Sequence, residues 1–264
     1  MAEPRRFVAL VLAGSRGPAD PVAQAASVPH KALAPVGGVP MLRRVLDALA
    51  ASPSVRRIVV QTNEPAIVAG LPGLQRAVAL GEIEILPTEA SPARSVSAAI
   101  ARLAAELPIL VTTADHALLT PEMVGHFCRN APQEADIAVG LAAASTVLAK
   151  YPGALRTFYK LGGERYSGCN LFALLTPQAR QAIDFWVRLE QHRKKPWRLI
   201  AAIGVRPLLL YLAGRLDLAR AMAELSRIVG VRGDAVLMPQ AEAPIDVDKP
   251  EDLVLAEKIL AGRG

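Results

Sequence analysis

The fold is decided by residues 7–31, FVALVLAGSRGPADPVAQAASVPHK. The apolar run Phe7–Ala13 predicts a buried strand, and it breaks directly into a loop that begins at Gly14. Glycine lets main-chain N–H groups approach phosphate oxygens where a side chain would block them. Arg16 adds a planar cationic fork to this loop, and Lys31 adds a point charge. A buried strand followed by such a loop is suited to cradling a nucleoside triphosphate.

Short apolar runs alternate with helical periodicity through the first 140 residues, a pattern typical of βαβ units. The predicted strands are Phe7–Ala13, Arg57–Thr62, Ile83–Leu86, Ile109–Thr113 and Ala135–Leu141. A predicted helix begins with Pro40 at its first position, and Thr120 followed by Pro121 and Glu122 is typical of another helix start. The sequence therefore predicts an α/β fold with a Rossmann-like, doubly wound and mostly parallel sheet.

The pattern changes after residue 141. It predicts a hairpin of Thr157–Leu161 with Glu164–Tyr166, and then a strand at Asn170–Leu174. A mainly helical stretch follows from Pro177 to about Gly230. The chain then continues with a short apolar run, Ala235–Met238, and a last helix, Pro250–Leu260. We interpret the chain as a single domain, residues 1–264, with a helical insertion at about 177–230.

Composition narrows the class of partner. The 264 residues are 52% hydrophobic and 20% charged, which is enough apolar sequence for a large core. A net charge of +6 favours an anionic partner. Only 4% of the residues are aromatic, and no basic block is interleaved with them, so nucleic acid is disfavoured and small anionic ligands are favoured.

Two cysteines, Cys128 and Cys169, lack the spacing of a metal or redox motif. We therefore expect reduced thiols and a cytoplasmic protein. The opening residues MAEPRRF lead into the first predicted strand without the apolar region of an export signal, which agrees with that expectation.

Residues 196–215, PWRLIAAIGVRPLLLYLAGR, are strongly apolar and follow the basic run His192–Lys195. Arginines at 198, 206 and 215 make a bilayer span expensive. Two interpretations stay open. A helix pair packed on the sheet or on a second subunit of a homodimer is favoured, and peripheral contact with an anionic membrane surface is the alternative.

Carboxylates follow the fourth strand and precede the last helix. Asp115 comes at the carboxyl edge of the predicted sheet, where open α/β sheets bind ligands, and it can hold a Mg²⁺ that bridges phosphate oxygens. The alternative is that Asp115 only caps a turn. Asp246 and Asp248 are two residues apart, so in an extended segment they face the same way. Asp248 is the first and Asp246 the second further metal candidate.

Glu251 and Asp252 have a simpler explanation. Both fall in the first turn of the predicted last helix, where the helix dipole favours negative charge whatever the function. We therefore assign them to the helix and not to a metal.

Three ordered blocks carry a resemblance to a known family. The first block contains the matching residues Leu12-Ala13-Gly14, Arg16, Lys31-Ala-Leu33 and Pro35–Leu42. The second is Thr113–Pro121, and the third is Asp246–Leu253. In these blocks the sequence resembles the MobA-like NTP transferases, which include molybdenum-cofactor guanylyl- and cytidylyltransferases and, more distantly, sugar-phosphate and alcohol-phosphate nucleotidyltransferases. The resemblance covers about the first 140 and the last 30 residues.

The resemblance implies a fold of the nucleotide-diphospho-sugar transferase type, and Mg²⁺ as cofactor. It places the catalytic groups at Arg16, Lys31 and Asp115, and the metal at Asp115 and Asp248. It places the binding of substrate at Leu12, Ala13, Gly14, Ser91, Ser95, Gly168 and Asn170, with the two serines near the nucleoside and the last two residues near the acceptor. The residues Pro18–Ala26 lengthen the first loop relative to the family, and the helical insertion has no counterpart in the molybdenum-cofactor enzymes.

The expected reaction moves a nucleoside monophosphate from an NTP, CTP or GTP, to a phosphorylated small molecule with release of pyrophosphate. A phosphate oxygen is already nucleophilic, so positioning and charge neutralisation supply the rate and no general base is needed. The four histidines are scattered, and we expect His30, His116, His126 and His192 to be structural or solvent-facing.

Two other functions stay open. A glycosyltransferase of related fold is disfavoured, because its usual Asp-x-Asp is missing at Asp115-His116-Ala117. A nucleotide-binding adaptor at a membrane surface would keep the nucleotide pocket and use the apolar, basic helices to bind a partner.

Overall fold

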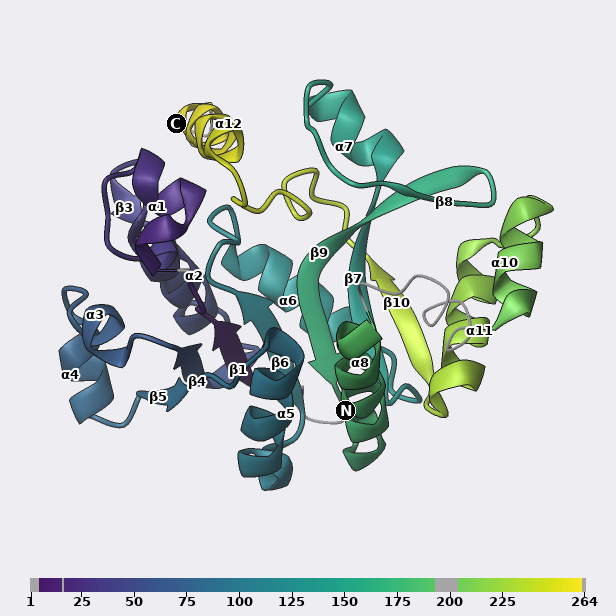
Figure 1. The fold of residues 1–264 in the computed structure, drawn as a ribbon, viewed down its shortest axis with the longest axis horizontal. Helices are drawn as coiled ribbons and strands as arrows, with labels where there is room; N and C mark the ends of the chain where they lie inside the picture. The colour runs from purple at the N-terminus through teal and green to yellow at the C-terminus, as the bar shows by residue number, and fades with distance from the viewer. Residues whose placement is uncertain (1–4, 16, 193–203, 263–264) are drawn as a thin grey trace.

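The computed structural model describes residues 5–15, 17–192 and 204–262. Its centre is an eight-stranded sheet in the order β5, β4, β1, β6, β9, β7, β10, with β8 paired to β9 (Figure 1). The strands are β1 (Phe7–Leu12), β4 (Val55–Thr62), β5 (Ile83–Pro87), β6 (Ile109–Thr113), β7 (Ile137–Ala143), β8 (Tyr159–Leu161), β9 (Glu164–Leu174) and β10 (Gly233–Leu237). A separate two-stranded ribbon joins β2 (Pro35–Val36) to β3 (Val39–Pro40).

The sheet is mostly parallel, as the sequence predicts. β1 runs parallel to both β4 and β6, β4 runs parallel to β5, and β7 runs parallel to β10. β9 lies antiparallel between β6 and β7. The doubly wound α/β prediction is confirmed.

Helices cover both faces of the sheet (Figure 1). Phe7, Ala9 and Val11 of β1 pack in one core with α2 and α6, whereas Val8 and Leu10 pack in a second core with α5 and α8. A central strand buried on both faces is expected to be apolar throughout, which is what the β1 sequence shows. The helices of the first 150 residues are α1 (Pro21–Ala25), α2 (Met41–Ala50), α3 (Pro65–Ala69), α4 (Leu74–Ala79), α5 (Pro92–Arg102), α6 (Pro121–Asn130) and α7 (Ala144–Lys150).

A third, smaller core joins the first loop to the end of the chain. Val22 of α1 and Val36 of β2 pack with Ile245 and Val247, which precede α12 (Pro250–Ala261). These segments lie together above the sheet in Figure 1. This core brings the first and last sequence blocks into contact although more than 200 residues separate them along the chain.

Two predictions are wrong in detail. The hairpin arm predicted to end at Tyr166 and the strand predicted at Asn170–Leu174 are one strand, β9. Ser167 and Gly168, which divide the two predicted segments, are common in turns, but both pair with β7 inside β9. Asn170 follows them in the left-handed conformation, with φ of 48°. Pro40 is the cap before α2 and not its first helical residue, because it still pairs in the β2–β3 ribbon.

The predicted helical stretch at 177–230 contains α8 (Arg180–His192), α10 (Val205–Leu212) and α11 (Leu218–Val229). α8 packs beside α5 on one face of the sheet, and α11 lies against β10. Residues 193–203, which include most of the basic run and the first part of the apolar stretch, lie outside the described residues. Within the described ranges, no helix is both long enough and apolar enough to cross a bilayer.

Candidate active site

The candidate site lies where the strand order reverses. From β1 the chain adds β4 and then β5 on one side, and it later adds β6 on the other side of β1. Ligands of open α/β sheets bind outside the carboxyl ends of the strands at such a point. Leu12 and Thr113 form the last register pair of β1 and β6, and the Ala114 amide donates to the Leu12 carbonyl oxygen over 2.9 Å. The loop after β1 and the carboxylate of Asp115 therefore leave the sheet side by side.

Asn63, just beyond the carboxyl end of β4, holds the first loop. The Ser15 amide donates to Asn63 Oδ1 over 2.9 Å, and Asn63 Nδ2 donates to the Ser15 carbonyl oxygen over 3.1 Å. The Ser15 hydroxyl in turn accepts from the Gly17 amide over 3.1 Å. Gly14 is exposed, and a Cβ added there would have open space within 4 Å. The fold itself therefore sets no steric demand for glycine at 14, and the predicted approach of phosphates to Gly14 stays a prediction. Arg16 lies outside the described residues.

Lys31 joins the first loop to two carboxylates. Its Nζ lies 2.6 Å from Asp115 Oδ2 and 2.8 Å from Asp248 Oδ1. Burial alone lowers the pKa of the Lys31 ammonium, but the charges of Asp115 and Asp248 and the hydrogen bonds to them outweigh it and raise that pKa above its usual value. Lys31 is thus a fixed cation at the edge of the sheet.

Asp115 faces this lysine and does not cap a helix. The cap of α6 is Thr120, whose hydroxyl accepts from the Met123 amide over 3.2 Å. Oδ1 of Asp115 is buried and has no hydrogen-bond partner in the described part of the chain. The Asp115 carbonyl oxygen accepts from the Val247 amide over 3.0 Å, so the backbone itself brings Asp246 and Asp248 to either side of Asp115.

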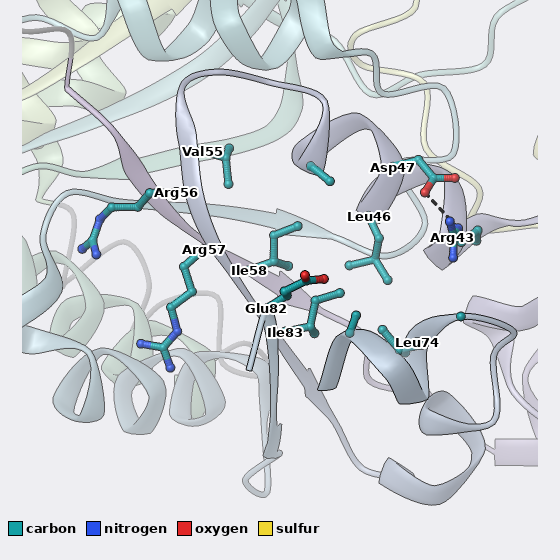
Figure 2. A pocket seen from close by; sticks show the side chains of 13 residues that line it. Arg43, Leu46, Asp47, Val55, Arg56, Arg57, Ile58, Leu74, Glu82 and Ile83 are labelled. Carbon is teal, nitrogen blue, oxygen red and sulfur yellow. Dashed lines mark ion pairs between the residues drawn. The ribbon is translucent and has the colours of Figure 1, made fainter. Parts of the chain in front are cut away.

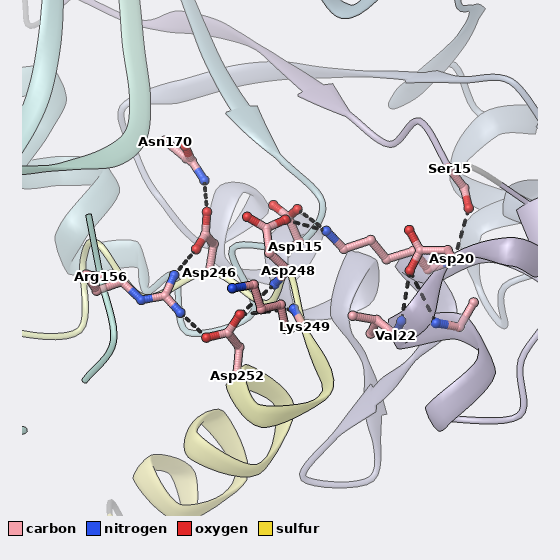
Figure 3. Close-up of polar contacts among 12 residues, drawn as sticks. Ser15, Asp20, Val22, Asp115, Arg156, Asn170, Asp246, Asp248, Lys249 and Asp252 are labelled. Carbon is pink, nitrogen blue, oxygen red and sulfur yellow. Dashed lines mark hydrogen bonds and ion pairs between the residues drawn. The ribbon is translucent and has the colours of Figure 1, made fainter. Parts of the chain in front are cut away.

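Asp246 is held by two side chains that come from the segment around β8 and β9 (Figure 3). Arg156 donates to one of its carboxylate oxygens, and Asn170 Nδ2 donates to the other over 2.6 Å. Burial raises the pKa of Asp246 to about 6, with repulsion from Asp115 and Asp248 adding to the shift, although Arg156 and Asn170 act to lower that pKa.

Arg156 also binds Asp252, so it bridges the two acids. The other carboxylate oxygen of Asp252 accepts from the amides of Asp248 and Lys249 over 3.1 and 3.0 Å, which caps α12. The helix-terminus role predicted for Asp252 is confirmed. The sequence did not reveal the part played by Arg156. This residue lies in the loop between α7 and β8 with no motif around it, and only the fold brings it to Asp246.

Asn170 reaches Asp246 because β9 is irregular. Val139 of β7 pairs with Phe172 and Leu141 pairs with Gly168, so three residues of β9 oppose one residue of β7. Extra residues of this kind bend a strand and turn a side chain away from its regular direction. Asparagine adopts the left-handed conformation found here more readily than most residues. Gly168 is exposed within the same irregular segment.

Ser95, one of the two serines predicted near the nucleoside, connects to the first loop through Gln61. The Ala13 amide donates to the Gln61 carbonyl oxygen over 2.8 Å, and Gln61 Nε2 donates to the Ser95 carbonyl oxygen over 2.9 Å. The Ser95 hydroxyl accepts from the Glu89 amide over 2.8 Å, and the Ser91 hydroxyl caps α5. Both hydroxyls thus shape the loop after β5, and the roles of these serines toward a nucleoside stay a prediction.

The donor set suits a metal that is also bound by its substrate. Among the described residues, no group of three or more His, Cys, Asp and Glu side chains is arranged to hold a metal ion by itself. Asp115 and Asp248 do converge on one cationic atom, and Asp115 keeps a buried oxygen without a partner. Mg²⁺ prefers one or two carboxylates and leaves its other positions to phosphates and water. The residues present fit that pattern.

The described histidines and cysteines take no part in this cluster as acids or nucleophiles. His30 is buried and its Nδ1 accepts from the Ala32 amide over 3.1 Å, while burial lowers the pKa of His116 to about 4 despite the nearby Asp115 charge. His126 lies at the surface, against the Leu237 carbonyl oxygen. The side chain of His192 lies outside the described residues. Cys128 and Cys169 are free and buried, and burial raises the pKa of both thiols.

Comparison with known proteins agrees with this geometry. A family model described as the MobA-like NTP transferase domain matches residues 9–228. The chain belongs to this family. It is therefore a nucleotidyltransferase that uses an NTP, and the resemblance seen in the sequence is confirmed. No curated protein matches the sequence.

Several solved structures resemble this NTP transferase. A hypothetical transferase from Thermus thermophilus is 31% identical, with a TM-score of 0.77 over 94% of this chain and 99% of that one. A CMP:2-keto-3-deoxy-manno-octonic acid synthetase complexed with CTP is 15% identical, with a TM-score of 0.57 over 98% and 100%. A 4-diphosphocytidyl-2C-methyl-D-erythritol synthase is 15% identical, with a TM-score of 0.56 over 98% and 100%. The last two show the shared fold.

The NTP transferase also has a cavity at the opposite edge of the sheet. This cavity of about 430 Å³ lies between α2, α4 and the amino ends of β4 and β5 (Figure 2). Its arginines already have acidic partners: Arg43 binds Asp47, and Arg57 binds Glu84 and Glu106. Because these cations are satisfied within the fold and lie away from the carboxyl edge, we do not assign the nucleotide to this cavity.

Proposed function

We propose that this nucleotidyltransferase transfers a nucleoside monophosphate from CTP or GTP to a phosphorylated small-molecule acceptor, with Mg²⁺ and with release of pyrophosphate. The convergence of Lys31, Asp115 and Asp248 on one point at the carboxyl edge of the sheet supports this proposal most directly. A lysine from the first sequence block meets carboxylates from the second and third blocks there. Positive charge and metal-holding oxygens are thus available to one triphosphate.

In the proposed reaction an acceptor phosphate oxygen forms a bond to the α-phosphorus of the NTP. The bond from the α-phosphorus to the bridging oxygen of the β-phosphate breaks, and its electron pair leaves with pyrophosphate. Mg²⁺ supplies charge neutralisation at the phosphates when it is bound. Asp115 and Asp248 would hold it, with Asp246 beside them.

The chain's own residues orient the reactants. The open position at Gly14 leaves room for the triphosphate to approach the main chain, and Lys31 neutralises charge that builds up on the phosphates. Arg16 is proposed as the second cation of this loop on the basis of its sequence position. Hydrogen bonds link Ser95 through Gln61 to Ala13. They fix the segment proposed to contact the nucleoside relative to the loop after β1, which is proposed to contact the phosphates.

On the acceptor side, Asn170 and the exposed Gly168 lie in the irregular segment of β9. The hydrogen bond from Asn170 to Asp246 fixes this segment relative to the carboxylates. A substrate that rests on β9 would therefore meet the triphosphate at a defined distance, and such fixed geometry is worth several orders of magnitude in rate.

Melting temperatures measured with each of the four NTPs, with Mg²⁺ and with EDTA, test the proposal. A ligand that binds only the folded state raises its melting temperature, by an amount that corresponds to about 2.7 kcal/mol at a hundred times Kd. CTP is the first nucleotide to test, because one structure of the same fold is a complex with CTP. We expect a Mg²⁺-dependent rise with CTP or GTP, followed by pyrophosphate release when a phosphorylated acceptor is added.

The same assays separate the alternatives. A glycosyltransferase would be stabilised by a nucleoside diphosphate sugar and would release no pyrophosphate from an NTP. If none of the four NTPs raises the melting temperature with Mg²⁺, the proposed function is wrong.

A further inference from the structure

A largely apolar cavity adjoins the candidate active site. It has a volume of about 420 Å³ and lies between the sheet and the helices of the predicted insertion. Its walls include Val111 and Val139 of the sheet, Ile183 and Trp186 of α8, and Leu225 of α11. Ligand pockets in proteins commonly have volumes of about 300 to 1,000 Å³, so the cavity is large enough for part of a small molecule.

The lining of the cavity selects against polar ligands. Among the residues that line it, polar side-chain atoms occur only on Thr112, Thr113 and Trp186. The hydroxyl oxygens of both threonines are buried without a hydrogen-bond partner in the described structure. A nucleobase or sugar placed here would leave most of its polar groups unpaired, which disfavours its binding. A hydrocarbon group has no such requirement.

The cavity is continuous with the edge of the sheet where transfer is proposed. Leu12 and Thr113 line it, and they form the last register pair of β1 and β6. Gly14 lies two residues after Leu12, and Asp115 lies two residues after Thr113. Two residues of extended chain span about 7 Å. On the acceptor side, Phe172 lines the cavity two residues after Asn170.

The cavity is open to solvent at aromatic side chains. Phe172 is 43% exposed and Trp186 is 38% exposed, although both line an apolar space. Large aromatic groups left in water beside an apolar cavity are typical of an entrance for a ligand with an apolar part.

We propose that this cavity binds the hydrocarbon part of the acceptor, so that the acceptor is a phosphate monoester of an aliphatic or isoprenoid alcohol. The proposal rests on the proposed function, which places the phosphate end of the acceptor at the carboxyl edge. The phosphate then lies by the cationic side chain of Lys31, and the chain extends from there beneath α8 and α11. The predicted insertion thereby gains a role as the outer wall of the acceptor site.

The affinities of alkyl phosphates, measured by titration calorimetry, test this assignment. Decyl phosphate, used below its micelle concentration, is compared with ethyl phosphate. Each buried methylene group tightens binding about fourfold, so we expect decyl phosphate to bind at least a hundredfold more tightly. Equal affinity for the two phosphates would overturn the proposal.

A variant that fills the cavity locates the site. Ala182 of α8 is half-buried and lines the cavity, whereas Ala223 of α11 is exposed and is not among the lining residues. Ala182→Phe is expected to weaken decyl phosphate binding at least tenfold, and the matched control Ala223→Phe to leave it unchanged. Trp186→Ala, at a part-exposed position, provides a second variant and should also weaken decyl phosphate binding. Equal effects of Ala182→Phe and Ala223→Phe would assign the binding elsewhere and overturn the proposal.

Nucleotide binding is measured in parallel, so that the two proposals fail separately. If CTP or GTP raises the melting temperature but chain length has no effect on alkyl phosphate binding, the cavity proposal is wrong and the proposed function stands. If decyl phosphate binds in an Ala182-dependent way but no NTP raises the melting temperature, the hydrocarbon site stands and the transfer reaction is wrong.

Discussion

At the amino edge of the sheet two glutamates, Glu84 and Glu106, are bound by three arginines. At the carboxyl edge the balance is reversed. Lys31 and Arg156 bind four aspartates there, at positions 115, 246, 248 and 252. Both edges are rich in ion pairs, but basic side chains outnumber acidic ones at the amino edge and acidic side chains outnumber basic ones at the carboxyl edge.

The two edges also differ in how fully their carboxylates are paired. The glutamates of the amino edge hold strands and helices together, and no buried carboxylate oxygen in that cluster is left without a partner among the described residues. At the carboxyl edge Asp115 keeps such an oxygen, and the pKa of Asp246 is raised to about 6. Crowded, partly buried negative charge costs stability, and the cation proposed to bind between these carboxylates would offset that cost.

Neutralising one carboxylate at each edge of the sheet should produce the largest difference between the two edges. Asp115→Asn is expected to abolish the Mg²⁺-dependent rise in melting temperature with NTP and to lower the rate of pyrophosphate release at least a hundredfold, because it removes a carboxylate proposed to hold the metal. Glu106→Gln is the matched control at the amino edge. It should leave both nucleotide readouts unchanged, and a comparable loss in both variants would contradict the assignment of the site.

A methyl group added at Gly14 tests the approach of the phosphates. Gly14 has open space around its Cβ position and is not among the residues with positive φ, so Gly14→Ala should leave the free energy of unfolding within about 0.5 kcal/mol of the original. We expect NTP binding to weaken at least tenfold, measured by titration calorimetry. Gly163→Ala, at an equally open position in the turn between β8 and β9, is the control and should bind NTP normally. Unchanged binding in Gly14→Ala would remove the phosphate loop from the model of the site.

Asp136, directly before β7, allows the structural role of the amino edge to be tested by the pH dependence of stability. Hydrogen bonds from Arg232 lower the pKa of Asp136 to about 2 even though burial opposes the shift. A carboxyl whose pKa is depressed in the folded state stabilises the fold above its unfolded pKa of 3.8, and loses that contribution as the pH falls toward 2.

Asp136→Asn should therefore cost on the order of 1–2 kcal/mol of unfolding free energy at pH 7, measured by urea denaturation. The difference between the variant and the original protein should shrink as the pH is lowered from 5 to 3. NTP affinity should not change, because this ion pair lies at the edge away from the candidate site. A difference that is independent of pH would mean that Asp136 acts through packing alone.

The smallest effect is expected at Asn170, where the backbone is left-handed. Asn170→Gly removes the hydrogen bond to Asp246 but also relieves the strain, so the free energy of unfolding should change by less than about 1 kcal/mol. Asn170→Ala loses the hydrogen bond and keeps the strain, and should be the less stable of the two variants by about 1 kcal/mol. Thermal denaturation measures both, and equal stability would show that the strain is not significant.

The sequence alone determined the alternation of strands and helices and the loop after β1. The reason is local: the run Phe7–Ala13 is apolar at every position, which only a strand covered on both faces requires. The cap of α6 is also a local signal, because the Thr120 hydroxyl accepts from an amide three residues along the chain. The three blocks that resemble NTP transferases were recognisable for the same reason.

Only the tertiary structure decided which side chains meet. Arg156 lies 90 residues from Asp246 along the chain, and no spacing rule links the two. The irregular register of β9, which turns Asn170 toward Asp246, depends on pairing with β7 and reads in the sequence as a turn. The apolar cavity depends in the same way on how α8 and α11 pack on the sheet. The spacing of apolar residues along a segment indicates which of its faces is buried. Contacts between distant segments depend instead on how the elements pack, which no single segment encodes.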